Sequence, residues 1–497
     1  MPPISVPQPP AHYKDSPETR LRLLWYFPIF LSVCIASIGV GYGFSDSFAM
    51  LYAAHHETLL QFARKPIEGG RPVYALLLWI GFSLTHSVHD LIYLRAFSVV
   101  SLALLAIHIH RTLRFTDLPQ YAVDVAPVLM CTVPAFLVYA SWAVAAFYPL
   151  AALLSAMAFQ VIDESNNGQR ASFRQLAAGF ALLVTAMTIY QPAAMYYWVF
   201  AAIAWQIGKE TVSEFRIAMA GVMMMLALAM DFVLSKILPV LIYTDGNTLT
   251  RTKLLSHSAG KAVWFIEQPL KDVLNWFNLE PNNTIAAIAA LFVLCGFALY
   301  RRHDGRRGVL TQLGIVCALA VLSYLPNLIV AENWASYRTQ AALSGLFVLY
   351  GMLAFIGWAR TFSWEWAARS AAYVITAGVA CWASYTILTE FAVPQIIDAH
   401  IVGRAVEKAA RTPDIRRLIL VTGNPLSTFA PYVRYDEFGI LSSSVPWALK
   451  AMAPLLTDNV LADRHIQVQV VHRCSLHDAR GLVVLRMQPI IRSYRSN

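Results

Sequence analysis

The chain alternates long apolar runs with short polar segments over most of its 497 residues. Many of these runs approach the roughly 20 residues that a helix needs to cross about 30 Å of hydrocarbon. The pattern therefore predicts an α-helical polytopic membrane protein with about eleven transmembrane helices. The predicted spans are residues 23–44, 91–110, 121–140, 143–162, 175–190, 192–207, 217–242, 283–300, 309–330, 340–358 and 370–391.

The apolar segment 73–88 decides the topology, because it either adds a crossing or stays on one side. If it stays on the outer side, the basic clusters between the spans all fall on the side of the N-terminus, as the positive-inside rule requires. These clusters are Arg111/Arg114, Arg170/Arg174, Lys209/Arg216, Arg301/Arg302/Arg306/Arg307 and Arg360/Arg369. We therefore expect residues 73–88 to form an interfacial or re-entrant helix at the outer face.

This topology divides the chain into three parts. The expected parts are a cytoplasmic N-terminus (1–22), a transmembrane domain (23–391) with outer loops 45–90 and 244–282, and a small periplasmic α/β domain (392–497). The first apolar run is too long for a signal peptide and is read as a span. In the last part, 396–410 has helical periodicity, and RRLILVTGN, IQVQVVHR and GLVVLRMQ are typical of strands.

Composition agrees with a membrane environment. The chain is 58% hydrophobic and 13% charged, whereas a soluble domain carries roughly 25% charged residues. The net charge of +9 is explained by the cytoplasmic loops, and no basic tract interleaved with aromatic residues points to nucleic acid. The six cysteines include no CxxC pair, so neither a disulfide framework nor a thiolate metal site is expected.

Acidic and basic side chains gather in the expected outer loops, where they could act on an anionic substrate. Arg and Lys stabilise an anionic leaving group, and a carboxylate takes the proton from an acceptor hydroxyl. Asp46 is the candidate base because it stands where the first span emerges. Two alternatives stay open. Asp46 could cap the following helix, and Arg71, Arg251 and Arg338 could anchor lipid headgroups.

The first outer loop resembles that of a known enzyme class. A span is followed by GYGFSDS, a juxtamembrane helix, KPIEGGRPVYALLLWIGFSL and LIYLRAFSVVSLALLAIHIHRTLR. This order resembles the GT-C glycosyltransferases that use polyprenyl-phosphate sugars. Gly70-Arg71-Pro72-Val73-Tyr74 and Tyr190-Gln191-Pro192 resemble short motifs of the bacterial O-antigen glucosyltransferases of the serotype-converting type.

The resemblance implies an inverting glycosyltransferase of the bacterial inner membrane. It would move a hexose such as glucose from polyprenyl phosphate to a surface glycan such as O-antigen, on the periplasmic face and without a cofactor. The general base would be Asp46, and the substrate-binding residues would be Arg71, Tyr74, Arg95, Tyr190, Gln191, Arg251, Lys253 and Arg338, with Glu57 and Glu68 as weaker candidates. Asp46 stands between two serines rather than beside a second acid, so metal dependence is not expected.

Other functions compete with this one. The same donor chemistry could serve a lipid A, pilin or wall-polymer acceptor. A lipid-linked sugar transporter or flippase would instead require polar residues along the spans and repeated halves. A non-catalytic assembly partner would depend on residues 395–497 and tolerate the loss of Asp46.

Overall fold

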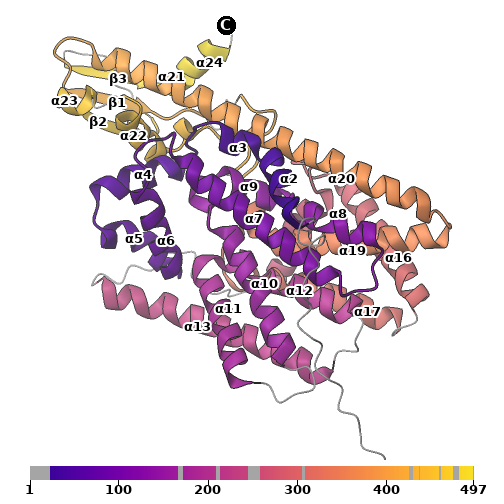
Figure 1. Cartoon of the computed structure of the whole chain (residues 1–497). Coiled ribbons are helices and arrows are strands. Elements are labelled where there is room, and N and C mark those ends of the chain that lie inside the picture. Colours follow the sequence, from indigo (N-terminus) through magenta and orange to yellow (C-terminus); the bar gives the residue numbers. More distant parts are fainter. Residues whose placement is uncertain are drawn as a thin grey trace, which may run out of the picture.

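The computed structural model describes residues 23–165, 172–208, 213–243, 258–304, 308–424, 429–435, 437–457, 460–473 and 481–495. Helices dominate this part of the chain, and a small sheet lies near the C-terminus (Figure 1). Large apolar side chains remain exposed on the long helices, including Val222, Met225 and Leu226. Such a surface requires lipid rather than water as its solvent.

The N-terminal helices are short. The first two lead to the expected outer loop, and the next three lie within it. They are α2 (Tyr26–Val33), α3 (Ile35–Gly39), α4 (Asp46–His56), α5 (Leu59–Glu68) and α6 (Pro72–Ser83). Helix α6 has 12 residues, which at 1.5 Å per residue gives about 18 Å. This is too short to cross the hydrocarbon core, in agreement with the expectation that segment 73–88 does not span the membrane.

The main body contains the longer helices. They are α7 (Leu91–Leu113), α8 (Gln120–Cys131), α9 (Pro134–Ser141), η1 (Ala143–Ala145), α10 (Tyr148–Ser165), α11 (Phe173–Ala194), α12 (Tyr197–Ala202), η2 (Ile203–Ile207), α13 (Glu214–Ile242), α14 (Ser258–Phe265), η4 (Ile266–Leu270), α15 (Lys271–Asn275), α16 (Asn283–Asp304), α17 (Val309–Leu322), α18 (Leu325–Ile329), η5 (Tyr337–Thr339), α19 (Ala341–Thr361) and α20 (Glu365–Ile387). Among the described residues, 7 helices are long and apolar enough to span a membrane, or 8 if the bent pair α8 and α9 counts as one.

The count of about eleven spans remains a prediction, because several predicted spans are broken into shorter helices. Segment 23–44 becomes α2 and α3, which meet at Cys34. Helices α8 and α9 meet at an angle of 55°, where Pro134 lacks an N–H and keeps Val133 extended. In α11, extended backbone at Tyr190 (φ −160°, ψ 106°) forms a kink.

Contacts bring several basic clusters to one end of the helical body. Arg301 Nη1 donates to the Gln206 carbonyl at 2.6 Å, and the backbone of Thr116, after α7, pairs with Gly208. Arg216, in the first turn of α13, forms an ion pair with Asp163 of α10 at 2.5 Å. These contacts join the ends of α7, η2 and α16 to one another, and the ends of α10 and α13 to each other, as expected if the basic clusters of each group share one membrane face.

Three strands occupy the three places that the sequence indicates. They are β1 (Arg417–Val421), β2 (Gln467–Val471) and β3 (Leu482–Arg486), which pair in parallel in the order β2-β1-β3. The accompanying elements are η6 (Leu388–Ala392), α21 (Val393–Ala410), η7 (Ser442–Ser444), α22 (Pro446–Leu455), α23 (Val460–Asp463) and α24 (Met487–Arg495). Leu418 and Leu420 on the central strand are fully buried.

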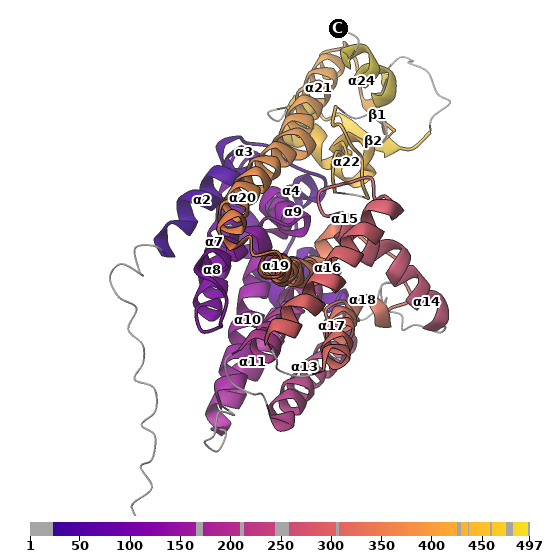
Figure 2. The same cartoon turned by 90° about the vertical axis from the view of Figure 1, so that its right-hand side faces the viewer.

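The last long helix connects this sheet region to the helical body. Residues Glu365–Ala410 form one helical stretch of 46 residues that contains an apolar segment long enough to span a membrane. The stretch runs without interruption across the expected domain boundary at residue 392. Figure 2 shows α20 and α21 in line, with the sheet at the far end. Phe48 of α4 belongs to the same buried apolar cluster as Ile401 and Leu449. The C-terminal region is therefore packed against the loop of residues 45–90, which the sequence places at the outer face.

Candidate active site

The loop before Asp46 is held by a buried arginine. Arg95 is 1% exposed and donates to the carbonyls of Ser37, Val40 and Tyr42 at 2.6, 2.9 and 2.7 Å, respectively. Its guanidinium also lies 4.0 Å from the centre of the Tyr42 ring. With these contacts, Arg95 shapes the backbone that leads to Asp46. This favours a structural role over the substrate contact that the resemblance implies.

Asp46 is the first residue of α4 and does not act as its N-cap. The N-cap is Ser45, which has a positive φ of 44° and makes no side-chain capping hydrogen bond. Asp46 Oδ1 instead accepts a hydrogen bond of 2.5 Å from the indole N–H of Trp447. The side chain is half-buried and is directed to the boundary between α4 and the C-terminal region, which argues against the capping alternative.

Beside Asp46 lies a group of tyrosines from three helices. The rings of Tyr148 and Tyr190 stack at 3.7 Å with an angle of 6°. Tyr148 donates to the Tyr74 hydroxyl at 3.3 Å, and Tyr74 donates to the Val144 carbonyl at 2.8 Å. Helix α4, which begins with Asp46, packs against α6, which carries Tyr74, and against η1, which carries Val144. The tyrosine group therefore lies next to the helix of the candidate base.

Arg71 reaches the same tyrosine stack from the start of α6. Its guanidinium lies 5.0 Å from the centre of the Tyr190 ring, and its buried Nε has no hydrogen-bond partner among the described residues. The neighbouring Gln191 amide donates to Asp231 at 3.2 Å and to the Gly70 carbonyl at 3.5 Å. Asp231, a buried acid within the apolar helix α13, is thus paired with Gln191.

Arg338 lies near the same group of tyrosines. Its guanidinium is 5.0 Å from the centre of the Trp142 ring, and Trp142 contacts Phe44 at 5.1 Å. The Tyr139 hydroxyl donates to the Arg338 carbonyl, and the Tyr139 ring meets the rings of Tyr148 and Tyr190 edge-on. Arg71 and Arg338 therefore both lie near one tyrosine stack, and the Phe44–Trp142 contact brings Arg338 to the loop that carries Asp46.

The remaining candidates lie apart from this group or outside the described residues. Glu57 is exposed and ends α4, while Glu68 forms an ion pair with Arg64 at 3.0 Å. Arg251 and Lys253 lie outside the described residues. The structure thus brings Asp46, Arg71, Tyr74, Tyr190, Gln191 and Arg338 together, and their roles toward a substrate remain a prediction.

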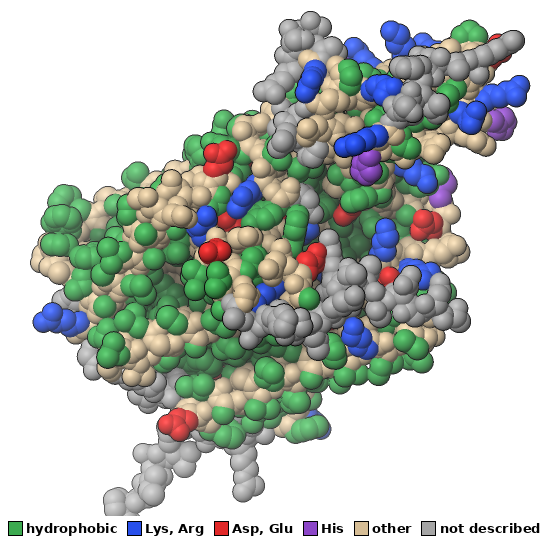
Figure 3. Space-filling model, turned by 180° about the vertical axis from the view of Figure 1, so that it is seen from behind, with side chains coloured by type: hydrophobic (Ala, Val, Ile, Leu, Met, Phe, Trp, Pro, Cys, Tyr) green, Lys and Arg blue, Asp and Glu red, His purple; other side chains and the backbone are tan. Residues whose placement is uncertain are grey.

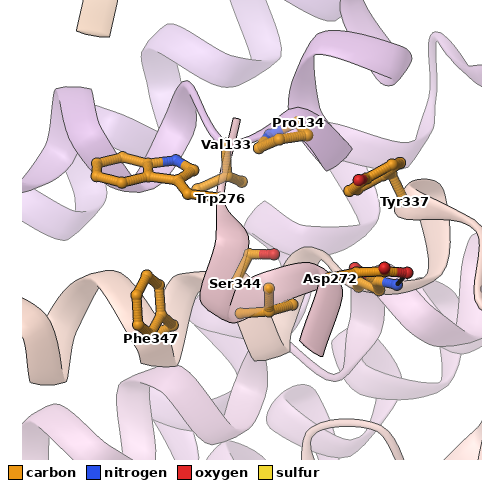
Figure 4. Close-up of a pocket in the computed structure, with 9 residues that line it drawn as sticks. Val133, Pro134, Asp272, Trp276, Tyr337, Ser344 and Phe347 are labelled. Carbon is orange, nitrogen blue, oxygen red and sulfur yellow. Dashed lines mark hydrogen bonds between the residues drawn. The ribbon is translucent and has the colours of Figure 1, made fainter. Parts of the chain in front are cut away.

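A second buried carboxylate lies beside this site. Asp272 of α15 accepts hydrogen bonds from Arg434 and Tyr435, both at 2.9 Å, and from Gln340 at 3.3 Å. Burial raises the pKa of Asp272, and the Arg434 charge and the Tyr435 hydrogen bond partly offset this effect. Figure 4 shows Asp272 and Tyr337 on one side of a narrow pocket and Trp276 and Phe347 on the other.

This pocket is closed to solvent molecules, since the centre of a water molecule finds no room in it. It adjoins the segment that carries Arg338 but contains none of the predicted substrate residues. No cluster of three or more His, Cys, Asp or Glu side chains is found in the described parts of the chain. Independence from a metal remains a prediction.

Comparison with known protein families identifies the family of this chain. A family model described as glucosyl transferase GtrII matches residues 58–356, which is more than half of the chain. The chain belongs to the GtrII glucosyltransferase family. It is therefore a glycosyltransferase, as the resemblance implies. Comparison with curated proteins found no match.

The range matched by the GtrII family model covers only part of the candidate site. It includes Arg71, Tyr74, Tyr190, Gln191 and Arg338 but neither Asp46 nor the C-terminal sheet region. Sequence patterns also missed four residues that contact the site. They are Tyr148, Asp272, Trp447 and Glu437, whose side chain accepts a hydrogen bond from the Arg338 backbone N–H. Neither a motif nor a periodicity distinguished Glu437 and Trp447, which join the site only through contacts between distant parts of the chain.

Proposed function

We propose that this GtrII family member transfers glucose from a polyprenyl-phosphate donor to a surface glycan such as O-antigen at the periplasmic face of the bacterial inner membrane. The observation that carries the proposal is the placement of Arg71 and Arg338 near one tyrosine stack, with the helix that begins at Asp46 packed beside it. This arrangement combines a site for a lipid-linked phosphate with a proton acceptor.

The reaction follows from the charges in the site. An acceptor hydroxyl oxygen attacks the anomeric carbon of glucose while the bond from that carbon to the phosphate oxygen breaks. The electron pair leaves with the phosphate, whose negative charge increases, and Arg71 and Arg338 stabilise it. Asp46 takes the proton of the attacking hydroxyl. Attack opposite the leaving phosphate inverts the anomeric configuration.

The aromatic side chains give the sugar a binding surface. Tyr74, Tyr148 and Tyr190 present flat apolar rings and hydroxyls in one group, which suits a ligand with apolar faces and polar edges. The periplasmic placement is supported by two features of the structure. The start of α13 carries Arg216, paired with Asp163, whereas Tyr243 after its other end donates to the Leu60 carbonyl in the loop that follows Asp46. Helix α6 is also too short to span the membrane.

The test measures glucose transfer by purified protein in lipid nanodiscs. Labelled polyprenyl-phosphate glucose is the donor, and lipid-linked O-antigen is the acceptor. Asp46→Asn keeps the size of the side chain but removes the proton acceptor, so kcat should fall by about 10²- to 10⁴-fold. Glu57→Gln, at the exposed end of the same helix, serves as the matched control and should stay within about twofold of the wild type. Near wild-type turnover by Asp46→Asn would rule out the base.

A further inference from the structure

The C-terminal region contributes a continuous segment to the edge of the active site. We name residues 437–447 the strap, since they lie between the two sides of the site. At one end, Glu437 contacts the segment that carries Arg338. At the other end, Ser442 and Trp447 contact the loop and helix that carry Asp46.

Glu437 holds the backbone of the candidate phosphate ligand. Its side chain is fully buried, and its two oxygens accept hydrogen bonds from the backbone N–H groups of Tyr337 at 2.8 Å and Arg338 at 3.0 Å. Glu437 Oε1 also lies 3.8 Å from Arg338 Nε. A carboxylate with both oxygens hydrogen-bonded in this way fixes the backbone of η5, and with it the position from which the Arg338 side chain extends.

The other end of the strap holds the loop of the candidate base. Ser442 Oγ accepts a hydrogen bond from the Ser45 backbone N–H at 2.8 Å and donates to Gln395 at 2.6 Å. Ser45 has the strained positive φ that precedes Asp46, and such strain persists only where surrounding contacts enforce it. The Trp447 indole then donates directly to the Asp46 carboxylate.

We infer that the strap is a positioning element of the active site, in which Glu437 orients Arg338 for the donor phosphate and Trp447 orients Asp46 for the acceptor hydroxyl. This inference rests on the proposed function and extends it to a part of the chain outside the matched family range. The C-terminal region is thus a component of the catalytic centre. Its contacts hold the candidate phosphate ligand and the candidate base through one continuous segment of the chain.

The kinetic test separates the two contacts. In Glu437→Gln, the side chain can accept a hydrogen bond from only one of the two backbone N–H groups, and its charge is lost. The KM for the donor should therefore rise about tenfold, with a smaller change in kcat. Trp447→Phe removes only the donor to Asp46 and should lower kcat about 3- to 10-fold at unchanged donor KM. Lys450→Ala, an exposed site on the same helix α22, is the control and should match the wild type.

Double variants distinguish positioning from general destabilisation. If Trp447 acts through Asp46, Trp447→Phe should cause no further loss in an Asp46→Asn background. Glu437→Gln should likewise cause no further loss in an Arg338→Ala background. Losses that multiply in these backgrounds, or wild-type kinetics in both single variants, would overturn the inference. Trp447 is 56% exposed, so its variant tests the inference even where Glu437→Gln lowers the yield of folded protein.

A second measurement does not depend on the donor. Hydrogen–deuterium exchange should be faster at the Tyr337 and Arg338 amides in Glu437→Gln than in the wild type, because a hydrogen-bonded amide is protected. An unchanged exchange rate would contradict the strap whatever the substrate is. If the wild type transfers no glucose from polyprenyl phosphate but the Tyr337 and Arg338 amides exchange faster in Glu437→Gln, the proposed donor is refuted and the strap is still supported.

Discussion

At the scale of single residues, the planar shape of Arg71 matters as much as its charge. Its guanidinium lies over the Tyr190 ring, and a lysine keeps the charge but neither stacks nor binds phosphate with two parallel hydrogen bonds. Arg71→Lys should therefore raise the donor KM about tenfold, which corresponds to the loss of one such interaction. Initial rates over a range of donor concentrations measure this effect.

The control for this prediction is Arg64→Lys in helix α5. Arg64 makes an ion pair with Glu68 four residues later, an interaction that lysine reproduces at a cost of about 0.5 kcal/mol or less. Its donor KM should equal that of the wild type. A KM for Arg71→Lys within twofold of the wild type would show that Arg71 does not hold the phosphate.

The sequence predicts those site residues that lie in or next to recognisable local patterns. Asp46, Arg71 and Tyr190 stand beside span ends and short motifs, and the structure brings them together. Arg95 shows the limit of such patterns, because its burial and its three carbonyl partners follow only from the folded chain. Trp447 meets Asp46 across 401 positions, a contact that no local pattern contains.

At the scale of elements, close crossing of α16 and α19 depends on two glycines that face each other. A Cβ atom at Gly357 would lie 2.2 Å from the Gly296 carbonyl oxygen and 2.7 Å from the Tyr300 nitrogen. Both neighbours are backbone atoms, so the helices must move apart. Gly357→Ala should therefore destabilise the protein by about 1–3 kcal/mol, measured as a lower midpoint of thermal unfolding in detergent.

Gly351 in the same helix supplies the matched control. A Cβ atom there meets nothing within 4 Å, so Gly351→Ala should leave the midpoint unchanged or raise it, since alanine favours helix by up to about 1 kcal/mol. Equal midpoints for the two variants would mean that the helices do not cross as closely as described.

Element boundaries were harder to predict than element types. Apolar length identifies helices such as α7 and α13, because a long run in lipid has few other ways to satisfy its backbone. The same length does not reveal breaks that tertiary packing imposes. The kink at Tyr190 and the bend between α8 and α9 divide predicted spans, although Pro134 and Pro192 were visible signals of irregularity.

At the scale of the whole molecule, polar contacts join the C-terminal region to the outer loops. In the face shown in Figure 3, hydrophobic side chains cover much of the body, and most charged side chains lie on or below the C-terminal region. The sequence predicts the three strands of this region, because their alternating or continuous apolar patterns are local. It does not predict the docking, because the contacts depend on single polar residues such as Ser442, Glu437 and Arg434.

The ion pair between Arg434 and Asp272 gives a test of this docking. Asp272 is fully buried in the pair, and the Arg434 side chain is 29% exposed. Arg434→Met leaves a buried carboxylate without its charged partner, although Tyr435 and Gln340 still donate to it. Such a change should cost about 3–5 kcal/mol at neutral pH. Adding Asp272→Asn to Arg434→Met should recover much of the lost stability, because it removes the buried charge.

The pH dependence of this variant follows from the direction of the Asp272 shift. Burial already raises the pKa of Asp272 in the presence of Arg434, and removal of that cation raises it further. Lower pH supplies the proton that neutralises the buried carboxylate. The loss of stability in Arg434→Met should therefore shrink between about pH 7.5 and about pH 5. Thermal unfolding of wild type and variant at both pH values measures this, and a loss that grows on acidification would contradict the buried pair.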